Sequence, residues 1–267
     1  MNGSGKTVLA VGATGSIGRF VVAAGLEKGY NMRALVRDPA RAQLPAQVQA
    51  VKGDLTKAET LREAVEGIDA VVFTHGSDGQ GKAGAESVDY GGVRNVLASL
   101  NSRPVRIALM TSIGVTNRTG AYNRSTQSHD WKRRAERLVR ASGNPYTIVR
   151  PGWFDYNNRD EHKLVFLQGD RRQSGTPQDG VIARRQIAEV LVESLTSDAA
   201  NRKTLELVAV AGPAQQDLEP LFAALKPDQQ DAFDAVGDEQ NQPLEKEPQR
   251  VREDLRIVLA LRSAAGR

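Results

Sequence analysis

The sequence contains no cysteine, which excludes disulfides and thiolate metal sites. Histidine is also scarce: the three histidines, His75, His129 and His162, are dispersed and show no metal-ligand spacing. No stretch approaches the length of a membrane-spanning helix, and the N-terminus lacks the apolar core of a signal peptide. These absences predict a soluble cytoplasmic protein without a metal centre and without a membrane partner.

An excess of charge of one sign is nearly absent as well. The formal net charge is +4 over 267 residues, and it comes mostly from arginines spread over predicted helices, such as Arg133, Arg134, Arg137 and Arg140. We interpret these arginines as a solvated helix face rather than a nucleic-acid-binding patch, although a basic chain still favours anionic ligands. The length fits one large α/β domain, or one domain with a small appendage.

What the chain does contain is a glycine-spaced turn near its N-terminus. Residues 8–11 form an apolar run that suits a buried parallel strand, and Gly12, Gly15 and Gly18 follow at the G-x-x-G-x-x-G spacing. An apolar-periodic helix is predicted over residues 17–28, and a second apolar strand completes a βαβ unit. This context predicts a dinucleotide-binding turn rather than glycines required only for close packing.

Each glycine of the turn has its own expected task. Gly12 lets the chain turn off the strand, Gly15 lets the backbone approach a pyrophosphate, and Gly18 lets the helix pack closely on the sheet. The free N–H groups at the helix start, with the helix dipole behind them, supply an anion site. Thr14 and Ser16 can add hydroxyl donors to that site.

Arg37 ends the second predicted strand, where dinucleotide-binding folds place the residue that contacts the adenosine ribose. An acidic residue there binds the 2′-hydroxyl of NAD, whereas a basic residue binds the 2′-phosphate of NADP. Arginine makes a bidentate, charge-assisted contact with phosphate, and Arg33 or Arg41 are candidates to assist it. Asp38 is the rival, because its carboxylate either caps the next turn or binds the hydroxyl.

Two further candidates follow later predicted strands, at the carboxyl edge where doubly wound sheets bind ligands. Asp54 comes after the strand over residues 48–51, and it either contacts an adenine amino group or caps a turn. His75 comes after the strand over residues 70–73 in a glycine-rich loop. It either faces the cofactor or, as loop histidines more often do, contacts solvent. A helix is predicted next, over residues 88–100.

Ser112 and Lys132 are the candidates for chemistry. Ser112 follows the strand over residues 105–110, and it either points into the same crevice or caps a turn. Lys132 lies near the start of a charged helix over residues 130–142, where a basic side chain faces solvent by default.

The alternation of seven predicted strands with helices indicates a doubly wound, mostly parallel α/β sheet. We expect a Rossmann domain over residues 1–212, in which the polar residues 155–180 form a substrate loop. Helical stripes over residues 213–267 predict an extension that packs on the core or on another subunit. Packing on another subunit would give a homo-oligomer.

Several motifs, taken in order, resemble those of the atypical short-chain dehydrogenase/reductases of the NAD(P)H-binding, NmrA-like kind. The motifs are VGATGSIGR, ALVRDP, GDLT, LMTSIGV, KRRAERLVRASG and YTIVRPGWF, and the match covers about residues 7–210. Several motifs in the right order are far more specific than one glycine triplet.

The resemblance implies how the cofactor is held. Its pyrophosphate would contact the turn through Gly12, Thr14, Gly15, Ser16, Ile17 and Gly18. Arg37 would meet the 2′-phosphate, and Asp54, with Leu55 beside it, would meet the adenine. We also count the loop residues Thr74, His75 and Gly76 among the residues predicted to bind the cofactor.

The resemblance also implies an active site at the nicotinamide end. Ser112 would be the active-site serine, and Lys132 would hold the nicotinamide ribose. The backbone that follows the sixth predicted strand would lie by the carboxamide, at Pro151, Gly152, Trp153 and Phe154.

One departure from the family pattern is that Ser128 stands where the catalytic Y-x-x-x-K would have tyrosine. The intact serine and lysine favour an NADP(H)-dependent reductase of a small carbonyl, quinone or flavin-like acceptor, with NADP(H) preferred over NAD(H). Tyr122 or Tyr156 would help Ser112 to orient that acceptor. The missing tyrosine favours the alternative, an NADP(H)-sensing regulatory protein that binds the nucleotide without turning it over.

Overall fold

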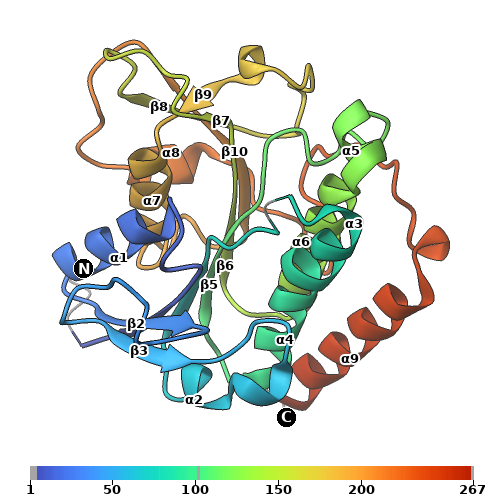
Figure 1. Cartoon of the computed structure of the whole chain (residues 1–267). Helices are drawn as coiled ribbons and strands as arrows, with labels where there is room; N and C mark the ends of the chain where they lie inside the picture. The colour runs from blue at the N-terminus through green and yellow to red at the C-terminus, as the bar shows by residue number, and fades with distance from the viewer. Residues whose placement is uncertain (1–4, 78, 101–102, 266–267) are drawn as a thin grey trace.

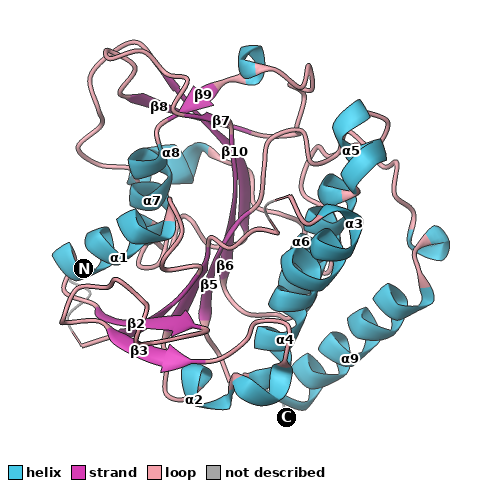
Figure 2. Ribbon diagram, in the orientation of Figure 1, coloured by secondary structure: helices cyan, strands magenta, loops and turns pink. Residues whose placement is uncertain are grey.

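The computed structural model describes residues 5–77, 79–100 and 103–265. Residues 1–4, at the start of the predicted Rossmann domain, and residues 266–267, at the end of the predicted C-terminal extension, lie outside these ranges. Asp78, in the loop predicted around His75, also lies outside them. Within them the strands form a ten-stranded sheet in the order β3-β2-β1-β4-β5-β6-β10-β9-β7, with β8 paired to β10. Helices cover both faces of the sheet, as Figures 1 and 2 show.

The parallel half of the sheet confirms the predicted doubly wound fold. Parallel pairing runs without interruption from β3 through β10, and the chain reverses its direction of travel across the sheet between β1 and β4. Ligands bind at such a switch point in doubly wound sheets. The strands are β1 (Thr7–Val11), β2 (Asn31–Val36), β3 (Gln49–Lys52), β4 (Ala70–Phe73), β5 (Arg106–Met110), β6 (Tyr146–Pro151), β7 (Trp153–Phe154), β8 (Lys163–Leu167), β9 (Val181–Ile182) and β10 (Lys203–Val210).

The helices divide into two groups, each with its own apolar core. Helices α1 and α7 pack together on one face of the sheet, whereas α4, α6 and α9 pack on the other (Figure 1). The helices are α1 (Gly18–Glu27), α2 (Arg62–Val65), α3 (Gly81–Gly84), the π-helix η2 (Ala85–Tyr90), α4 (Gly91–Ser99), α5 (Ala121–Thr126), α6 (Ser128–Ala141), α7 (Arg184–Glu193), α8 (Glu219–Ala224) and α9 (Gln249–Ala265), with short 3₁₀ turns η1 (Ala58–Thr60), η3 (Pro177–Asp179) and η4 (Leu244–Lys246).

Two predicted segments differ from the structure, and the short helix α5 lies where no element was predicted. The substrate loop expected over residues 155–180 contains β8, which pairs antiparallel with β10 and so belongs to the sheet. The helix expected from residue 88 begins earlier, at Gly81, and passes through the π-helix η2 before it reaches α4. Short elements such as β8 and α5 are set by tertiary contacts rather than by periodicity.

The C-terminal residues pack on the core of their own chain. On α9 the apolar stripe Val251, Leu255 and Val258 is buried against α4 and α6, while Ile257 stays exposed. On α8, Phe222 packs into the opposite core against Phe166, with the ring centroids 5.1 Å apart. Between these helices runs a stretch rich in carboxylates, residues 228–247, which we call the acidic strap.

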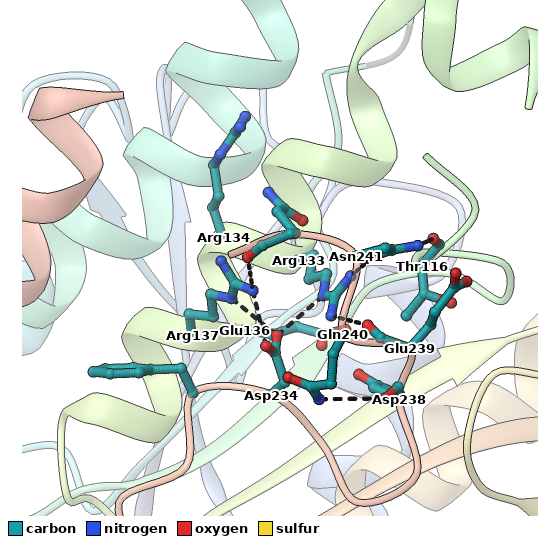
Figure 3. Close-up of polar contacts among 12 residues, drawn as sticks. Thr116, Arg133, Arg134, Glu136, Arg137, Asp234, Asp238, Glu239, Gln240 and Asn241 are labelled. Carbon is teal, nitrogen blue, oxygen red and sulfur yellow. Dashed lines mark hydrogen bonds and ion pairs between the residues drawn. The ribbon is translucent and has the colours of Figure 1, made fainter. Parts of the chain in front are cut away.

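The arginines of α6 are buried, so their interpretation as a solvated helix face is wrong. Arg137 donates to both carboxylate oxygens of Asp234 at 2.9 and 2.8 Å and to Glu247 at 2.8 Å. Arg133 reaches Asp234 at 3.0 Å, and Arg134 reaches Glu247 at 2.6 Å. Figure 3 shows the guanidinium groups of Arg133 and Arg137 directed at Asp234 of the acidic strap. Their partners lie about a hundred residues away in sequence, which helical periodicity does not reveal.

A second layer of buried charge connects α6 to the sheet. Arg150, at the end of β6, is fully buried and donates to Glu136 at 3.0 and 2.7 Å and to Asp238 at 2.8 and 2.7 Å. Burial alone would raise the pKa of Asp238, but its ion pair with Arg150 brings that pKa below the usual value. Arg140, also on α6, bonds Asp228 of the strap at 3.1 Å. The acidic strap therefore neutralises arginines from both α6 and β6.

Candidate cofactor site and active site

The glycine turn combines two packing glycines with one exposed glycine. Gly12 has φ +90°, and a side chain there would meet the His75 backbone nitrogen at 2.8 Å, while one at Gly18 would overlap the Gly12 carbonyl oxygen. At Gly15 an added Cβ would meet only that same oxygen, at 3.1 Å. The exposed part of the turn is Thr14, Gly15 and Ser16, and Ile17 is buried beneath it. The start of α1 is therefore open to an anion.

Arg37 is exposed at the end of β2, beside this turn. The suggestion that Arg33 assists it is wrong, because the Arg33 guanidinium donates to the carbonyl oxygens of Ala64 and Glu66 at 3.1 and 2.6 Å, at the end of α2. Asp38 accepts the backbone N–H of Ala40 at 3.1 Å, as a turn cap does. Arg37 is thus the side chain of this group that is left for a ligand, whereas the exposed Arg41 lies 3.9 Å from Asp38.

Asp54 caps a turn, in agreement with one of its two interpretations. Its Oδ1 accepts the backbone N–H and the hydroxyl of Thr56 at 2.9 and 2.7 Å. These bonds from Thr56 lower the pKa of Asp54, so the carboxylate is ionised near neutral pH. The next residue, Leu55, is half-buried, and its carbonyl oxygen accepts Asn95 at 2.9 Å. The chain therefore forms a hydrogen-bonded turn after the carboxyl end of β3, and the Asp54 carboxylate in this turn is partly exposed.

The His75 ring points into the protein, so the expected solvent contact is wrong. Its Nε2 lies 3.1 Å from the carbonyl oxygen of Val88 in η2, and its buried Nδ1 has no hydrogen-bond partner among the described residues. Burial lowers the pKa of His75 to about 4, which leaves the ring neutral at pH 7. Thr74 continues the β4 pairing with a backbone bond to Val11, and Gly76 is exposed.

Lys132 is held by an ion pair that the sequence did not indicate. Its Nζ lies 2.9 Å from Oδ1 of Asp89, and its side chain is only 20% exposed, so the expected solvent-facing position is wrong. Asp89 also accepts the backbone N–H and the hydroxyl of Ser77, at 3.1 and 2.8 Å. Asp89 lies in the π-helix η2, and π-helical turns occur often at functional sites. A lone aspartate in a predicted helix gives no local signal of this role.

Ser112 presents a buried hydroxyl at the carboxyl end of β5. Its Oγ has no hydrogen-bond partner among the described residues, and the same is true of Nδ1 of His129 on α6. Buried polar groups are normally paired, so an orphaned hydroxyl at a ligand-binding edge can serve a bound ligand. Ser128, where the resemblance described above predicts a tyrosine position, is the buried first residue of α6.

The loop that follows Ser112 is held by hydrogen bonds to Asp170 and to the acidic strap. Asp170 accepts the backbone N–H groups of Gly114 and Thr116, both at 2.7 Å. Asn241 of the strap donates to the carbonyl oxygen of Thr116 at 3.0 Å, a contact drawn in Figure 3. The loop that follows Ser112 is thus hydrogen-bonded to the same acidic strap that neutralises the buried arginines.

The end of β6 brings a group of aromatic side chains to the same edge. Pro151 ends β6, and a side chain at Gly152 would overlap the Gly180 carbonyl oxygen, so the chain crosses closely there. Beyond it, the rings of Trp153 and Tyr156 are arranged edge to face at 6.1 Å, and Tyr156 is 63% exposed. Phe154 lies between them in sequence and is half-buried.

Arg184 also reaches this site, although no sequence pattern marked it. It is the first residue of α7, and the packing of α7 on α1 brings it over the glycine turn. Its Nε donates to Ser16 Oγ at 3.1 Å, and its guanidinium lies 5.3 Å from the centroid of the Phe154 ring. It also forms an ion pair with Asp155.

Comparisons with known proteins were made by sequence and by structure. A profile of the family described as NAD(P)H-binding matches residues 12–198. The sanguinarine reductase of Eschscholzia californica is 27% identical, over 81% of this chain and 95% of that protein. A putative NAD-dependent epimerase/dehydratase from Bacillus halodurans has a TM-score of 0.68 at 24% identity, over 83% of this chain and 100% of the other.

A second solved structure has the same fold and contains a nucleotide. It is a short-chain dehydrogenase/reductase from Veillonella parvula in complex with NADP, with a TM-score of 0.59 at 16% identity, over 76% of this chain and 94% of that one. In the part of the chain that the structure describes, no helix is both long and apolar enough to cross a membrane.

Proposed function

The chain belongs to the NAD(P)H-binding family, whose members include reductases, and from that premise we propose that it is an NADP(H)-dependent reductase. The proposed reaction is hydride transfer to a small carbonyl, quinone or flavin-like acceptor. The observation that carries the proposal is the orphaned Ser112 hydroxyl, which lies at the same sheet edge as the exposed glycine turn.

The described residues fit the cofactor along this edge. The turn from Gly12 to Gly18 would hold the pyrophosphate, Arg37 the 2′-phosphate, and Asp54 with Leu55 the adenine. Since the His75 ring faces Val88, this residue would contribute its backbone, together with Thr74 and Gly76. Lys132 would hold the nicotinamide ribose, and the backbone from Pro151 to Phe154 would flank the carboxamide.

The cofactor would supply the hydride, and the protein would position the acceptor. Ser112 can donate a hydrogen bond to an acceptor oxygen, because its hydroxyl has no other described partner. The resemblance predicts a tyrosine acid at position 128, where this chain has Ser128, and His75 is a poor acid at pH 7 because burial lowers its pKa to about 4. Quinones and flavins need such an acid less than simple ketones do. The aromatic residues Trp153 and Tyr156 are suited to stacking on a planar acceptor.

The preference for NADPH is expected to depend on Arg37. A hydrogen bond to a charged group contributes about 1.5–3 kcal/mol, so NADPH should bind about 10- to 100-fold more tightly than NADH. Arg37→Glu should remove or reverse this preference. Titration of both nucleotides by calorimetry measures it, with Arg256→Glu, at an exposed position of α9, as the control. Equal affinity of the wild type for NADPH and NADH would remove Arg37 from this role.

Turnover is expected to depend on Lys132 and to be faster with quinones or flavins than with aliphatic ketones. General acid catalysis contributes roughly 10²–10⁴-fold, and ketones need it most. Lys132→Ala should lower kcat/KM by about 10- to 100-fold, since one charge-assisted contact with the ribose is lost. NADPH absorbance with a panel of acceptors measures both effects. Thermal melting shows whether the variant, which leaves Asp89 without its lysine, still folds.

The alternative function is nucleotide sensing without turnover, and the serine at position 128 is the observation that favours it. The same acceptor panel separates the two functions. Tight NADPH binding with no turnover of any acceptor would support the sensor, whereas rapid ketone reduction would show that another group replaces the tyrosine as acid.

A further inference from the structure

Arg184 connects two parts of the site that are far apart in sequence. From the first turn of α7 its Nε reaches Ser16 Oγ, 3.1 Å away in the exposed glycine turn. The same guanidinium pairs with Asp155 and lies 5.3 Å from the Phe154 ring centroid, in the segment that follows β6. Its side chain is 32% exposed, so it bridges the turn and this segment at the surface.

The ion pair with Asp155 is weak enough for the Arg184 guanidinium to leave it for another partner. The Asp155 side chain is 50% exposed, and ion pairs at such positions contribute little to stability because water screens them. Its backbone has φ +58°, a left-handed conformation in which aspartate and asparagine are tolerated. Asp155 also accepts the backbone N–H of Arg184 at 3.2 Å, so the two residues stay together when the guanidinium moves.

We propose that Arg184 binds the pyrophosphate and leaves Asp155 when the nucleotide binds. This inference rests on the proposed function. A guanidinium within hydrogen-bond reach of Ser16 lies next to the position of any pyrophosphate on the turn. Arginine forms stronger, bidentate bonds with phosphate oxygens than with a screened surface carboxylate. The exchange would remove the ion pair but keep the bond from the Arg184 backbone N–H to Asp155, so nucleotide binding would take away one of the two contacts that hold the segment around Tyr156.

The experiment measures the dissociation constant of NADPH by calorimetry for single and double variants. Arg184→Gln should weaken binding by about 10- to 100-fold, because a charge-assisted contact is lost. Asp155→Asn should tighten it by about 2- to 5-fold, because a competing surface ion pair is removed while the turn conformation is kept. Arg185→Gln, at the next position of α7, is the matched control, since Arg185 pairs with Glu189 on its own helix.

The double variant distinguishes exchange from simple charge repulsion. If Arg184 exchanges partners, Asp155→Asn should have no effect in the Arg184→Gln background. Tightening that persists in that background would overturn the exchange, because Asp155 would then act on the nucleotide directly. The probe 2′-AMP, which has the 2′-phosphate but no pyrophosphate, should bind all variants alike.

Two outcomes separate this inference from the proposed function. Wild-type protein that binds no NADPH would overturn the proposed function itself. Wild-type protein that binds NADPH, together with unchanged affinity in Arg184→Gln, would overturn only the role of Arg184. If Arg184→Gln fails to fold in a thermal melt, Arg184→Lys serves in its place. It keeps the charge but loses the bidentate geometry, and it should weaken NADPH binding by less than the glutamine variant would.

Discussion

Replacing Asp238 with asparagine is expected to lower the free energy of unfolding by about 3–5 kcal/mol. Asp238 and Arg150 are both buried, and two hydrogen bonds of 2.8 and 2.7 Å join them. The amide of asparagine is neutral and turns a donor toward the guanidinium, which leaves part of a buried charge uncompensated. Domains of this kind have total stabilities of about 5–15 kcal/mol, so the loss should be large. Urea unfolding, with the midpoint and slope compared, measures it.

The control for this variant is Asp231→Asn, in the same acidic strap. Asp231 is 64% exposed and pairs with Arg262 at the surface, so its loss should cost less than about 1 kcal/mol. Its backbone has φ +63°, which asparagine also tolerates. Equal losses in the two variants would show that the buried pair is no more important than the exposed one.

Replacing Gly15 with valine is expected to weaken NADPH binding by about 100-fold or more while the protein stays folded. The valine methyl groups would occupy the space above the turn where the pyrophosphate is proposed to lie. At least two charge-assisted hydrogen bonds would then be lost, at about 1.5–3 kcal/mol each. The fold should survive, because a Cβ at Gly15 meets only the Gly12 carbonyl oxygen, at 3.1 Å, and a small shift relieves this contact.

Gly18→Ala provides the contrast, because it should damage folding rather than binding alone. A Cβ there would overlap the Gly12 carbonyl oxygen inside the packed turn. Fluorescence titration of NADPH and circular dichroism measure the two properties separately. Full NADPH affinity in a folded Gly15→Val protein would contradict the assignment of the pyrophosphate to this turn.

The fold class could be predicted because its signals are local. In β1 and β4 the apolar runs VLAV and AVVF are buried throughout, as central parallel strands require. The same reasoning missed β8, whose place beside β10 depends on pairing across the sheet rather than on its own sequence. The parallel half of the sheet could therefore be predicted from the sequence, whereas the antiparallel part could not.

The candidate site divides in the same way. Ser112 and the glycine turn follow strands directly, so their shared edge could be predicted. Asp89 and Arg184 reach the site through helix packing, and their sequence neighbourhoods give no sign of it. The α6 arginines were misread for a related reason: a run of charged residues indicates exposure only when no opposite charge is folded over it.

The acidic strap has a consequence for how the protein is made. The strap carboxylates follow the arginines that they neutralise by 88 to 113 residues, as the Arg140–Asp228 and Arg134–Glu247 pairs show. A ribosome adds about 5–20 residues per second, so this interval lasts on the order of 5–20 s. During that time α6 cannot dock on the sheet without burying unpaired arginines, which is strongly unfavourable. We therefore expect the nucleotide-binding half to complete its fold only after the strap has been synthesised, although most of its own sequence is finished earlier.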